Sequence, residues 1–190
     1  CQAMASTRLT LAALTSAAIG VVERSGFDAL TLTAVADELG VATSTLYTHI
    51  GGLDGLKHLV AEAATRNLTG ELRNSAIGIS GPDALLAMAV AYREFALDHP
   101  GQFASTLLPP RVGNGDLADA DAELLRVFVL VYRAAGLDDA ESELAARAVR
   151  SAIHGFLTIE HSTGSRAEHD AEYRYLLAAL QRGLLQRDAG

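Results

Sequence analysis

Apolar residues recur at the spacing of one helix face through the first third of the chain. From Leu11 to Val22 they follow an i, i+3, i+7 pattern, and Gly26 is suited to end that helix. A threonine cap and a terminal glycine bound the next segment in the same way. A short segment after it keeps its threonines and serine on the face opposite its apolar residues. The pattern predicts helices at about residues 11–25, 31–39, 41–50 and 54–73.

A stretch rich in Ser, Gly and Asn interrupts the pattern after residue 73, and Pro82 then fits the first turn of a new helix. Further helices are predicted at about residues 82–98, 117–135, 138–162 and 167–186, with a short turn or helix before residue 107. Residues 109–115, rich in proline and glycine, are expected to form a long, flexible loop. Because no segment alternates at the period of a strand, the predicted fold class is all-α. We expect a three-helix domain at residues 1–52, a connecting fourth helix at 53–73 and a second helical domain at 74–190.

The composition agrees with a helical protein and limits the kinds of partner that it can bind. Ala and Leu, both good helix formers, supply 35 and 29 of the 190 residues. With 15 basic and 23 acidic residues the net charge is −8, so any contact with nucleic acid must be local. Cys1 is the only cysteine, which favours a reducing compartment. The apolar run at residues 9–22 is too short for a membrane span and lacks a signal-peptide cleavage site, so we expect a cytoplasmic protein with no membrane partner.

The sequence carries no signature of an enzyme or a metal centre. It has no glycine-rich phosphate loop and no G-x-S-x-G, H-E-x-x-H or C-x-x-C motif. His154 and His161 share one predicted helix but lie about 10 Å apart along its axis, too far to chelate one ion by themselves. We therefore expect no catalytic residue, no cofactor and no metal.

The second and third predicted helices have the layout of a helix-turn-helix, with Gly40-Val41 as the turn before a short polar helix. A more specific likeness is carried by residues 26–36, 39–41 and 44–50, which read GFDALTLTAVA, LGV and STLYTHI. Together these residues resemble the DNA-binding domain of the TetR/AcrR family of bacterial transcriptional regulators. The resemblance covers residues 8–66 closely and extends more loosely to the helical remainder.

This resemblance implies a ligand-responsive regulator, a repressor that a small hydrophobic effector releases from its operator. Residues 1–52 would bind double-stranded DNA at an inverted repeat, and residues 74–190 would bind the effector and form a homodimer. In the family pattern Thr31 contacts a phosphate, while the hydroxyls of the third helix face base edges. For His49, base reading and a packing role both stay open. The predicted DNA-binding residues are Thr31, Thr33, Thr43, Ser44, Thr45, Tyr47, Thr48, His49 and Lys57.

The chain departs from the family pattern in the charge of its DNA-binding end. Leu53 and Thr33 stand where many relatives have a basic residue, and residues 1–70 hold four basic residues against six acidic ones. DNA-binding domains are usually basic, so we expect weaker and less salt-dependent DNA binding than is normal for such folds. The alternative is a helical small-molecule-binding protein with weak or lost DNA affinity. An enzyme that uses His154 is a third, poorly supported possibility.

The second half of the chain holds most of its few aromatic residues. They form a core or line an apolar pocket for the effector, and the sequence leaves both alternatives open. The candidate ligand-binding residues are Met88, Tyr92, Phe95, Phe103, Phe128, Tyr132 and His154.

The last two predicted helices pair in the family with their twofold mates as a four-helix bundle. The alternative is that they only close the core of the monomer. The candidate dimer-interface residues are Val149, Ala152, Ile153, Phe156, Leu176, Leu177, Leu180 and Leu184. The segment Ile153-His154-Gly155 is also similar to a subgroup with a Trp-His-Gly segment there, although Ile153 replaces the Trp. A glycine inside a helix costs about 1 kcal/mol relative to alanine, so Gly155 invites a packing reason.

Overall fold

The computed structural model describes residues 9–110, 115–163 and 166–185, and over these ranges the chain forms helices and no strands. The all-α prediction is confirmed, and apart from the third helix the long helices begin and end within two residues of the predicted bounds. Residues 111–114 of the predicted flexible loop lie outside the described residues. The helices are α1 (Leu11–Ser25), α2 (Leu32–Leu39), α3 (Thr43–Leu46), α4 (Leu53–Ser75), α5 (Gly81–Asp98), α6 (Pro100–Ser105), α7 (Gly115–Ala134), α8 (Asp139–Thr163) and α9 (Arg166–Leu185).

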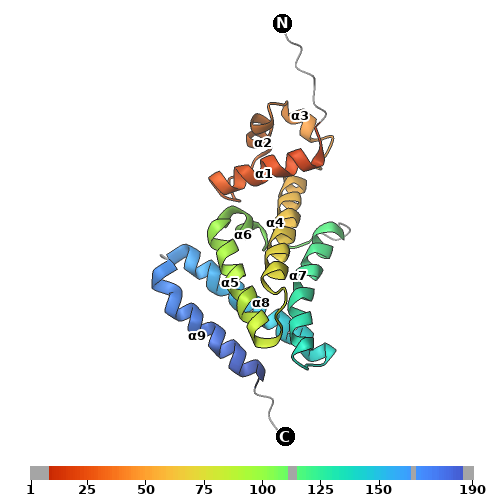
Figure 1. The fold of residues 1–190 in the computed structure, drawn as a ribbon. Coiled ribbons are helices and arrows are strands. Elements are labelled where there is room, and N and C mark those ends of the chain that lie inside the picture. The colour runs from red at the N-terminus through yellow and green to blue at the C-terminus, as the bar shows by residue number, and fades with distance from the viewer. Residues whose placement is uncertain (1–8, 111–114, 164–165, 186–190) are drawn as a thin grey trace.

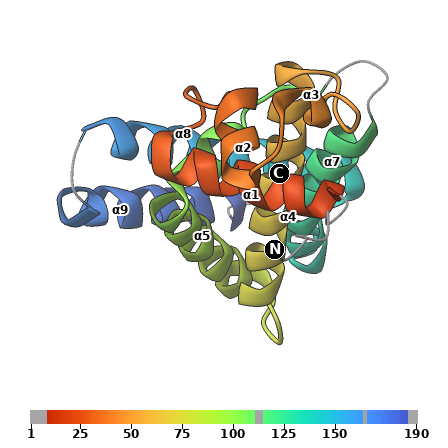
Figure 2. The same ribbon diagram turned by 90° about the horizontal axis from the view of Figure 1, so that it is seen from above.

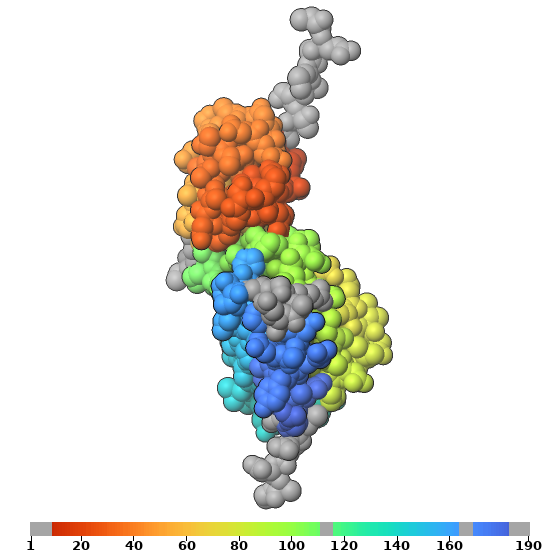
Figure 3. Space-filling view, turned by 90° about the vertical axis from the view of Figure 1, so that its left-hand side faces the viewer, coloured from red at the N-terminus to blue at the C-terminus, as the bar shows by residue number. Residues whose placement is uncertain are grey.

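Helices α1, α2 and α3 stand at one end of the molecule, where they form a head above the bundle of α5 to α9 (Figure 1). The space-filling view shows the head as a lobe of its own (Figure 3). Its core is a cluster of buried residues from α1, α2, α3 and the first turns of α4, among them Leu14, Val35, Leu46 and Leu56. Seen from above, the head covers one end of the bundle (Figure 2).

The turn between α2 and α3 follows from two residues. Thr31 caps α2, because its hydroxyl oxygen accepts a hydrogen bond from the backbone N–H of Ala34 at 3.1 Å. Gly40 ends α2 with φ 65°, in the left-handed region that a glycine adopts without strain.

The third helix is shorter than predicted. The sequence pattern predicted a helix over residues 41–50, but α3 is a single turn, Thr43–Leu46, and turns follow it to Ile50. The hydroxyl of Thr48 donates to the carbonyl of Thr45 at 2.7 Å, and the N–H of Thr48 bonds to the same carbonyl at 3.3 Å. Such bonds between side chain and backbone compete with continued α-helix, and the predicted bounds did not take them into account.

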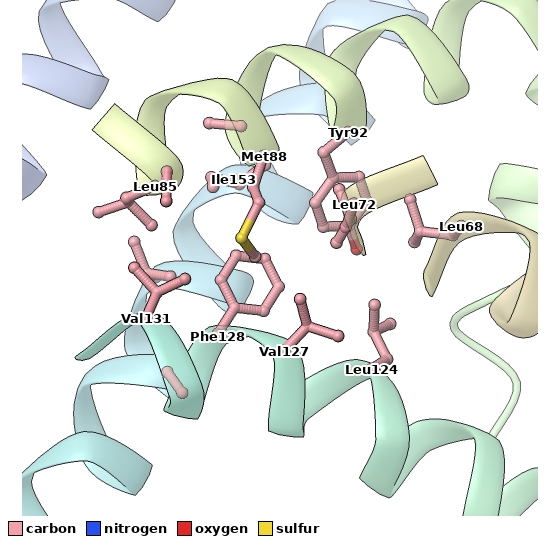
Figure 4. Close-up of a cluster of buried hydrophobic side chains, with 14 of the residues drawn as sticks. Leu68, Leu72, Leu85, Met88, Tyr92, Leu124, Val127, Phe128, Val131 and Ile153 are labelled. Atoms are coloured by element: carbon pink, nitrogen blue, oxygen red, sulfur yellow. The ribbon is translucent and has the colours of Figure 1, made fainter. Parts of the chain in front are cut away.

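Helix α4 belongs to both ends of the molecule. Leu56 and Val60 lie in the core of the head, whereas Leu68 and Leu72 lie in the core of the bundle. The bundle core is formed with α5, α7 and α8, and Figure 4 shows Met88 against Phe128 with Leu72, Leu124 and Ile153 around them. One continuous helix thus joins the two cores.

The head also rests on α6. The carboxylate of Glu23 in α1 accepts hydrogen bonds from the backbone N–H groups of Gly101 and Gln102 at 3.2 and 3.1 Å. It also accepts one from the Gln102 side chain at 3.1 Å. Gly101 is buried, and a Cβ at this position would lie 2.2 Å from the backbone oxygen of Val22. Only a glycine therefore allows this close approach of α6 to α1.

Helix α9 is held to the bundle by an ion pair with a buried arginine and by a tyrosine hydrogen bond. The Arg93 guanidinium in α5 makes a bidentate contact with Glu160 in α8, and its Nη1 donates to Asp170 in α9 at 2.6 Å. Tyr173 in α9 donates its hydroxyl to the carbonyl of Ala89 at 2.6 Å. Among the residues that the structure describes, no helix combines the length and the hydropathy that a membrane span requires.

Candidate functional site

The predicted DNA-binding residues of α3 and its following turn lie on the surface of the head. Ser44, Tyr47, Thr48 and His49 are exposed, Tyr47 to 58%. Leu46 on the opposite face of the turn is fully buried in the core of the head. The short helix is therefore anchored on one side and presents polar side chains on the other.

The other predicted DNA-binding residues differ in how far they are exposed to solvent. Thr43 and Thr45 are half-buried, whereas Thr31 and Thr33 at the start of α2 are exposed. The amino group of Lys57 lies 5.6 Å from the ring centroid of Phe27, a cation–π distance. The structure thus brings the α2 and α3 residues to the head surface and places Lys57 on the adjoining first turns of α4.

Ion pairs further reduce the positive charge that the DNA-binding end can offer to a phosphate. Arg24 pairs with Glu38, and Arg66 pairs with Glu62 at 3.1 Å. Arg8, the remaining arginine of this segment, lies outside the described residues. Two of the four basic residues of this end are thus partly neutralised by neighbouring carboxylates.

Most of the candidate ligand-binding residues fill the core of the bundle. Met88, Tyr92 and Phe128 are fully buried, and Phe95 and Phe103 are 4% exposed. The packing favours the core alternative for these five side chains. Tyr132 borders a small apolar hollow, and burial raises the pKa of its hydroxyl, which has no hydrogen-bond partner among the described residues.

His154 differs because it lines an open groove between α7 and α8, of ≈ 630 Å³. Its Nδ1 lies 2.9 Å from the Tyr92 hydroxyl, and its ring stacks on Phe103 with centroids 4.4 Å apart. The pKa of His154 is lowered to about 4, first by burial and second by the positive charge of Arg150. The imidazole is therefore neutral at physiological pH.

Leu125 on α7 and Arg150 and Ser151 on α8 also line this groove, and none of these three was predicted as a site residue. A signal was present, since Arg150 precedes His154 by four positions and so shares its helix face. The approach of Leu125 from another helix had no sequence signal.

The candidate dimer-interface residues divide by burial. Val149, Ile153 and Leu177 are at most 5% exposed and lie in the chain's own core, so the core alternative applies to these three. The side chain of Leu184 lies outside the described residues. The rest, Ala152, Phe156, Leu176 and Leu180, are half-buried. Among the described side chains of α8 and α9, the large apolar ones that are exposed are Leu144, Ile159 and Tyr175, at 71, 61 and 72%.

Comparison with known families covers both ends of the molecule. A family described as "Bacterial regulatory proteins, tetR family" matches residues 14–56, which include α2, α3 and the turn between them. A second, "Tetracyclin repressor-like, C-terminal domain", matches residues 85–180. The chain belongs to the TetR family. The resemblance seen in the sequence is thereby confirmed.

Relatives of this TetR-family chain are regulators. It is 29% identical over 183 residues to an uncharacterised HTH-type transcriptional regulator of Mycobacterium tuberculosis. The matched region covers 95% of this chain and 84% of the relative. It is 27% identical over 165 residues to the uncharacterised HTH-type regulator YobS of Bacillus subtilis, 85% of this chain and 84% of the relative. The chain is accordingly a DNA-binding transcriptional regulator and not an enzyme.

Solved structures share the TetR fold along nearly the whole chain. A protein of unknown function from Rhodococcus sp. RHA1 superposes with a TM-score of 0.75 at 22% identity, over 97% of this chain and 100% of that one. BioQ bound to its natural double-stranded DNA operator superposes with a TM-score of 0.71 at 24% identity, over 94% of this chain and 99% of that one. At these identities the likeness concerns the fold.

Proposed function

We propose that the protein is an operator-binding repressor that reads DNA with α3 and is released by a small ligand bound in the bundle. The observation that carries the proposal is the exposed polar face of α3, anchored by Leu46 beside the capped start of α2. A side chain that reads a base must be exposed and also held in place, and this arrangement meets both conditions.

Each exposed residue has a role that follows from its chemistry. Ser44 and Thr48 read base edges in the major groove, where a hydroxyl accepts or donates and a threonine methyl contacts thymine. Because the Thr48 proton is already donated to Thr45, Thr48 acts there as an acceptor. Tyr47 and Thr31 hold phosphates, and His49 lies at the edge of the same face. Thr33, Thr43, Thr45 and Lys57 complete the contact surface.

DNA binding by this head is expected to depend weakly on salt. If Lys57 alone contacts phosphate in each subunit of a dimer, the slope of log K against log[salt] is about −2, and about −4 if Arg8 joins. Six to ten phosphate contacts would give roughly −5 to −9. Fluorescence anisotropy between roughly 50 and 200 mM salt measures the slope.

The matched control for this slope is Lys57→Gln, which should flatten it by about 2 because one contact is lost from each subunit. A slope of −6 or steeper would contradict the low charge of the head. No binding to any duplex at low salt would favour the alternative function, a helical small-molecule-binding protein, for which the paired Arg24 and Arg66 are the motivating observation.

The proposed dimer forms through the outer faces of α8 and α9. Leu144 and Ile159 are exposed on α8, and the small residues Ala148 and Gly155 lie between them on the same side of the helix. Tyr175 adds an exposed aromatic ring on α9. Large apolar side chains around a stripe of small ones suit a twofold helix contact, and two heads are needed to read an inverted repeat.

Gly155 gives a test of this interface. Apart from the nearby backbone of its own helix, a Cβ at Gly155 would meet no atom of the described residues within 4 Å, so no packing contact among them requires a glycine there. Gly155→Leu is therefore expected to leave the monomer folded and to raise the dimer dissociation constant at least about tenfold, a loss of about 1.4 kcal/mol. Sedimentation velocity measures this constant. Ala118→Leu, on the exposed face of α7, is the control, and equal dimerisation by both variants would refute the assignment.

Helix α4 would transmit the effect of the ligand from the bundle to the head. Because α4 contributes to both cores, a ligand that shifts its lower half also moves the head and changes the spacing of the two α3 helices. Transcription in vitro from a promoter that carries the operator tests the repressor role. The protein should lower the transcript yield, and stimulation instead would assign it as an activator.

A further inference from the structure

We propose that the groove between α7 and α8 binds an organic carboxylate with an apolar body, held by Arg150 and by the Nε2–H group of His154. The proposal rests on the proposed ligand response and names the class of ligand for it. At ≈ 630 Å³ the groove lies within the range of about 300–1,000 Å³ that is typical of small-molecule sites. Its lining includes Leu107, Leu125, Arg150, Ser151, His154 and Gly155.

The first observation is a polar atom that nothing in the described chain satisfies. His154 is 7% exposed, and its Nε2 is buried without a hydrogen-bond partner among the described residues. The remaining ring nitrogen is occupied by the Tyr92 hydroxyl. An unpaired buried N–H is costly, and an oxygen atom of a ligand in the groove would satisfy it.

The hydrogen bond with Tyr92 leads us to assign the ring proton of His154 to Nε2. Burial raises the pKa of the Tyr92 hydroxyl to about 12, and the positive charge of Arg150 opposes this effect. The hydroxyl therefore keeps its proton at neutral pH, and we assign this proton to the 2.9 Å hydrogen bond with Nδ1 of His154. With Nδ1 as acceptor, the neutral ring has its hydrogen on Nε2. The groove therefore offers donors and selects a ligand acceptor.

The charge of the lining favours one negative charge on the ligand. Arg147 and Arg150 line the groove, and none of the described residues that line it is acidic. Arg150 already shares its charge with Asp121 at 2.8 Å, so a monoanion balances the site better than a dianion. Leu125 and the 62% exposed Leu107 provide apolar contact for the rest of the ligand.

Three probes with the same alkyl chain test the proposal on the full chain by isothermal titration calorimetry: decanoate, 1-decanol and decylamine. Decanoate should bind about tenfold or more tightly than 1-decanol, since a charge-assisted hydrogen bond is added, and decylamine should bind most weakly. The pair 1-naphthoate and 1-naphthol repeats the comparison with an aromatic body. A preference for the carboxylate in either pair supports the proposal.

Variants locate the site. Arg150→Met should weaken carboxylate binding about tenfold and leave alcohol binding unchanged, whereas Arg126→Met, at an exposed arginine of α7 that does not line this groove, should change neither. His154→Phe keeps an aromatic ring against Phe103 but removes the N–H donor, so it should weaken both ligands. Circular dichroism melts establish that each variant is folded.

Three outcomes would overturn the proposal: equal affinity for carboxylate and alcohol, equal effects of the two arginine variants, or no binding of any probe. Operator affinity measured in the same samples keeps the two proposals apart. If the operator is bound while the carboxylate preference is missing, only the ligand class fails. If the preference holds but decanoate and 1-naphthoate leave operator affinity unchanged, the groove assignment stands and the ligand-release function fails.

Discussion

Replacement of Gly101 by alanine is expected to lower the melting temperature of the protein and to weaken its binding to DNA. The added Cβ would lie 2.2 Å from the oxygen and 2.5 Å from the carbonyl carbon of Val22, and 2.9 Å from the backbone nitrogen of Glu23. These are backbone atoms of α1, so they cannot rotate away as a side chain would. Either α6 or the head must move, and the three hydrogen bonds to the Glu23 carboxylate would lengthen. We expect a loss of about 2–3 kcal/mol in the free energy of unfolding.

The matched control is Gly70→Ala in the C-terminal half of α4. Apart from the nearby backbone of α4 itself, a Cβ there meets no atom of the described residues within 4 Å, so the same substitution should stabilise the protein by up to about 1 kcal/mol through helix propensity. Thermal denaturation followed by circular dichroism compares the two, and anisotropy with DNA at a temperature where both are folded measures the effect on the head. If Gly101→Ala melted as high as Gly70→Ala, the contact between α1 and α6 would have no energetic importance.

Loss of the Glu160 charge is expected to destabilise the bundle by about 3–5 kcal/mol. Glu160 is 2% exposed, and both of its oxygens bond to the Arg93 guanidinium. In Glu160→Gln the buried arginine loses a bidentate carboxylate partner, whereas Asp170 in α9, the side chain of which is 46% exposed, stays in place. The face of the Tyr173 ring, 4.9 Å from the guanidinium carbon, would not replace a carboxylate.

Two further variants separate charge from packing in this pair. Glu62→Gln removes the carboxylate of an ion pair on the surface of α4 and should change stability by no more than about 1 kcal/mol. The double variant Arg93→Met, Glu160→Leu removes both charges and should be more stable than Glu160→Gln, because no charge is left buried. Urea denaturation measures all three, and a double variant less stable than the single one would contradict this account.

The helices of this protein are predictable from sequence because their signals are local. The Thr31 cap and the Gly40 stop act within a few residues of where they stand, and the structure confirms both. The length of α3 was not predictable from apolar spacing, since Leu46 and Ile50 fit a helix while the hydroxyl of Thr48 favours a turn. The exposed set on the head followed from the same pattern, because residues opposite Leu46 must face solvent.

Contacts between segments that are distant in the sequence were hardly predictable from it. Glu23 was interpretable only as part of the end of the first helix, yet its carboxylate caps a helix that begins 77 residues later, at Pro100. The sequence left core and pocket open for Tyr92 and His154 alike, whereas in the structure Tyr92 fills the core and His154 lines a groove. Whether an aromatic residue lines a cavity depends on how neighbouring helices diverge, which no single helix encodes.

The central claim, that α3 reads an operator, is tested most directly by selection from genomic DNA. Fragmented DNA of the organism that encodes the protein is incubated with it at low salt, and the bound fragments are sequenced, with a variant carrying Ser44→Ala and Thr48→Val as control. We predict one enriched inverted repeat whose half-sites lie about one helical turn apart, roughly 34–36 Å, and no such enrichment by the variant. Absence of an enriched repeat, or equal enrichment by the variant, would contradict the claim.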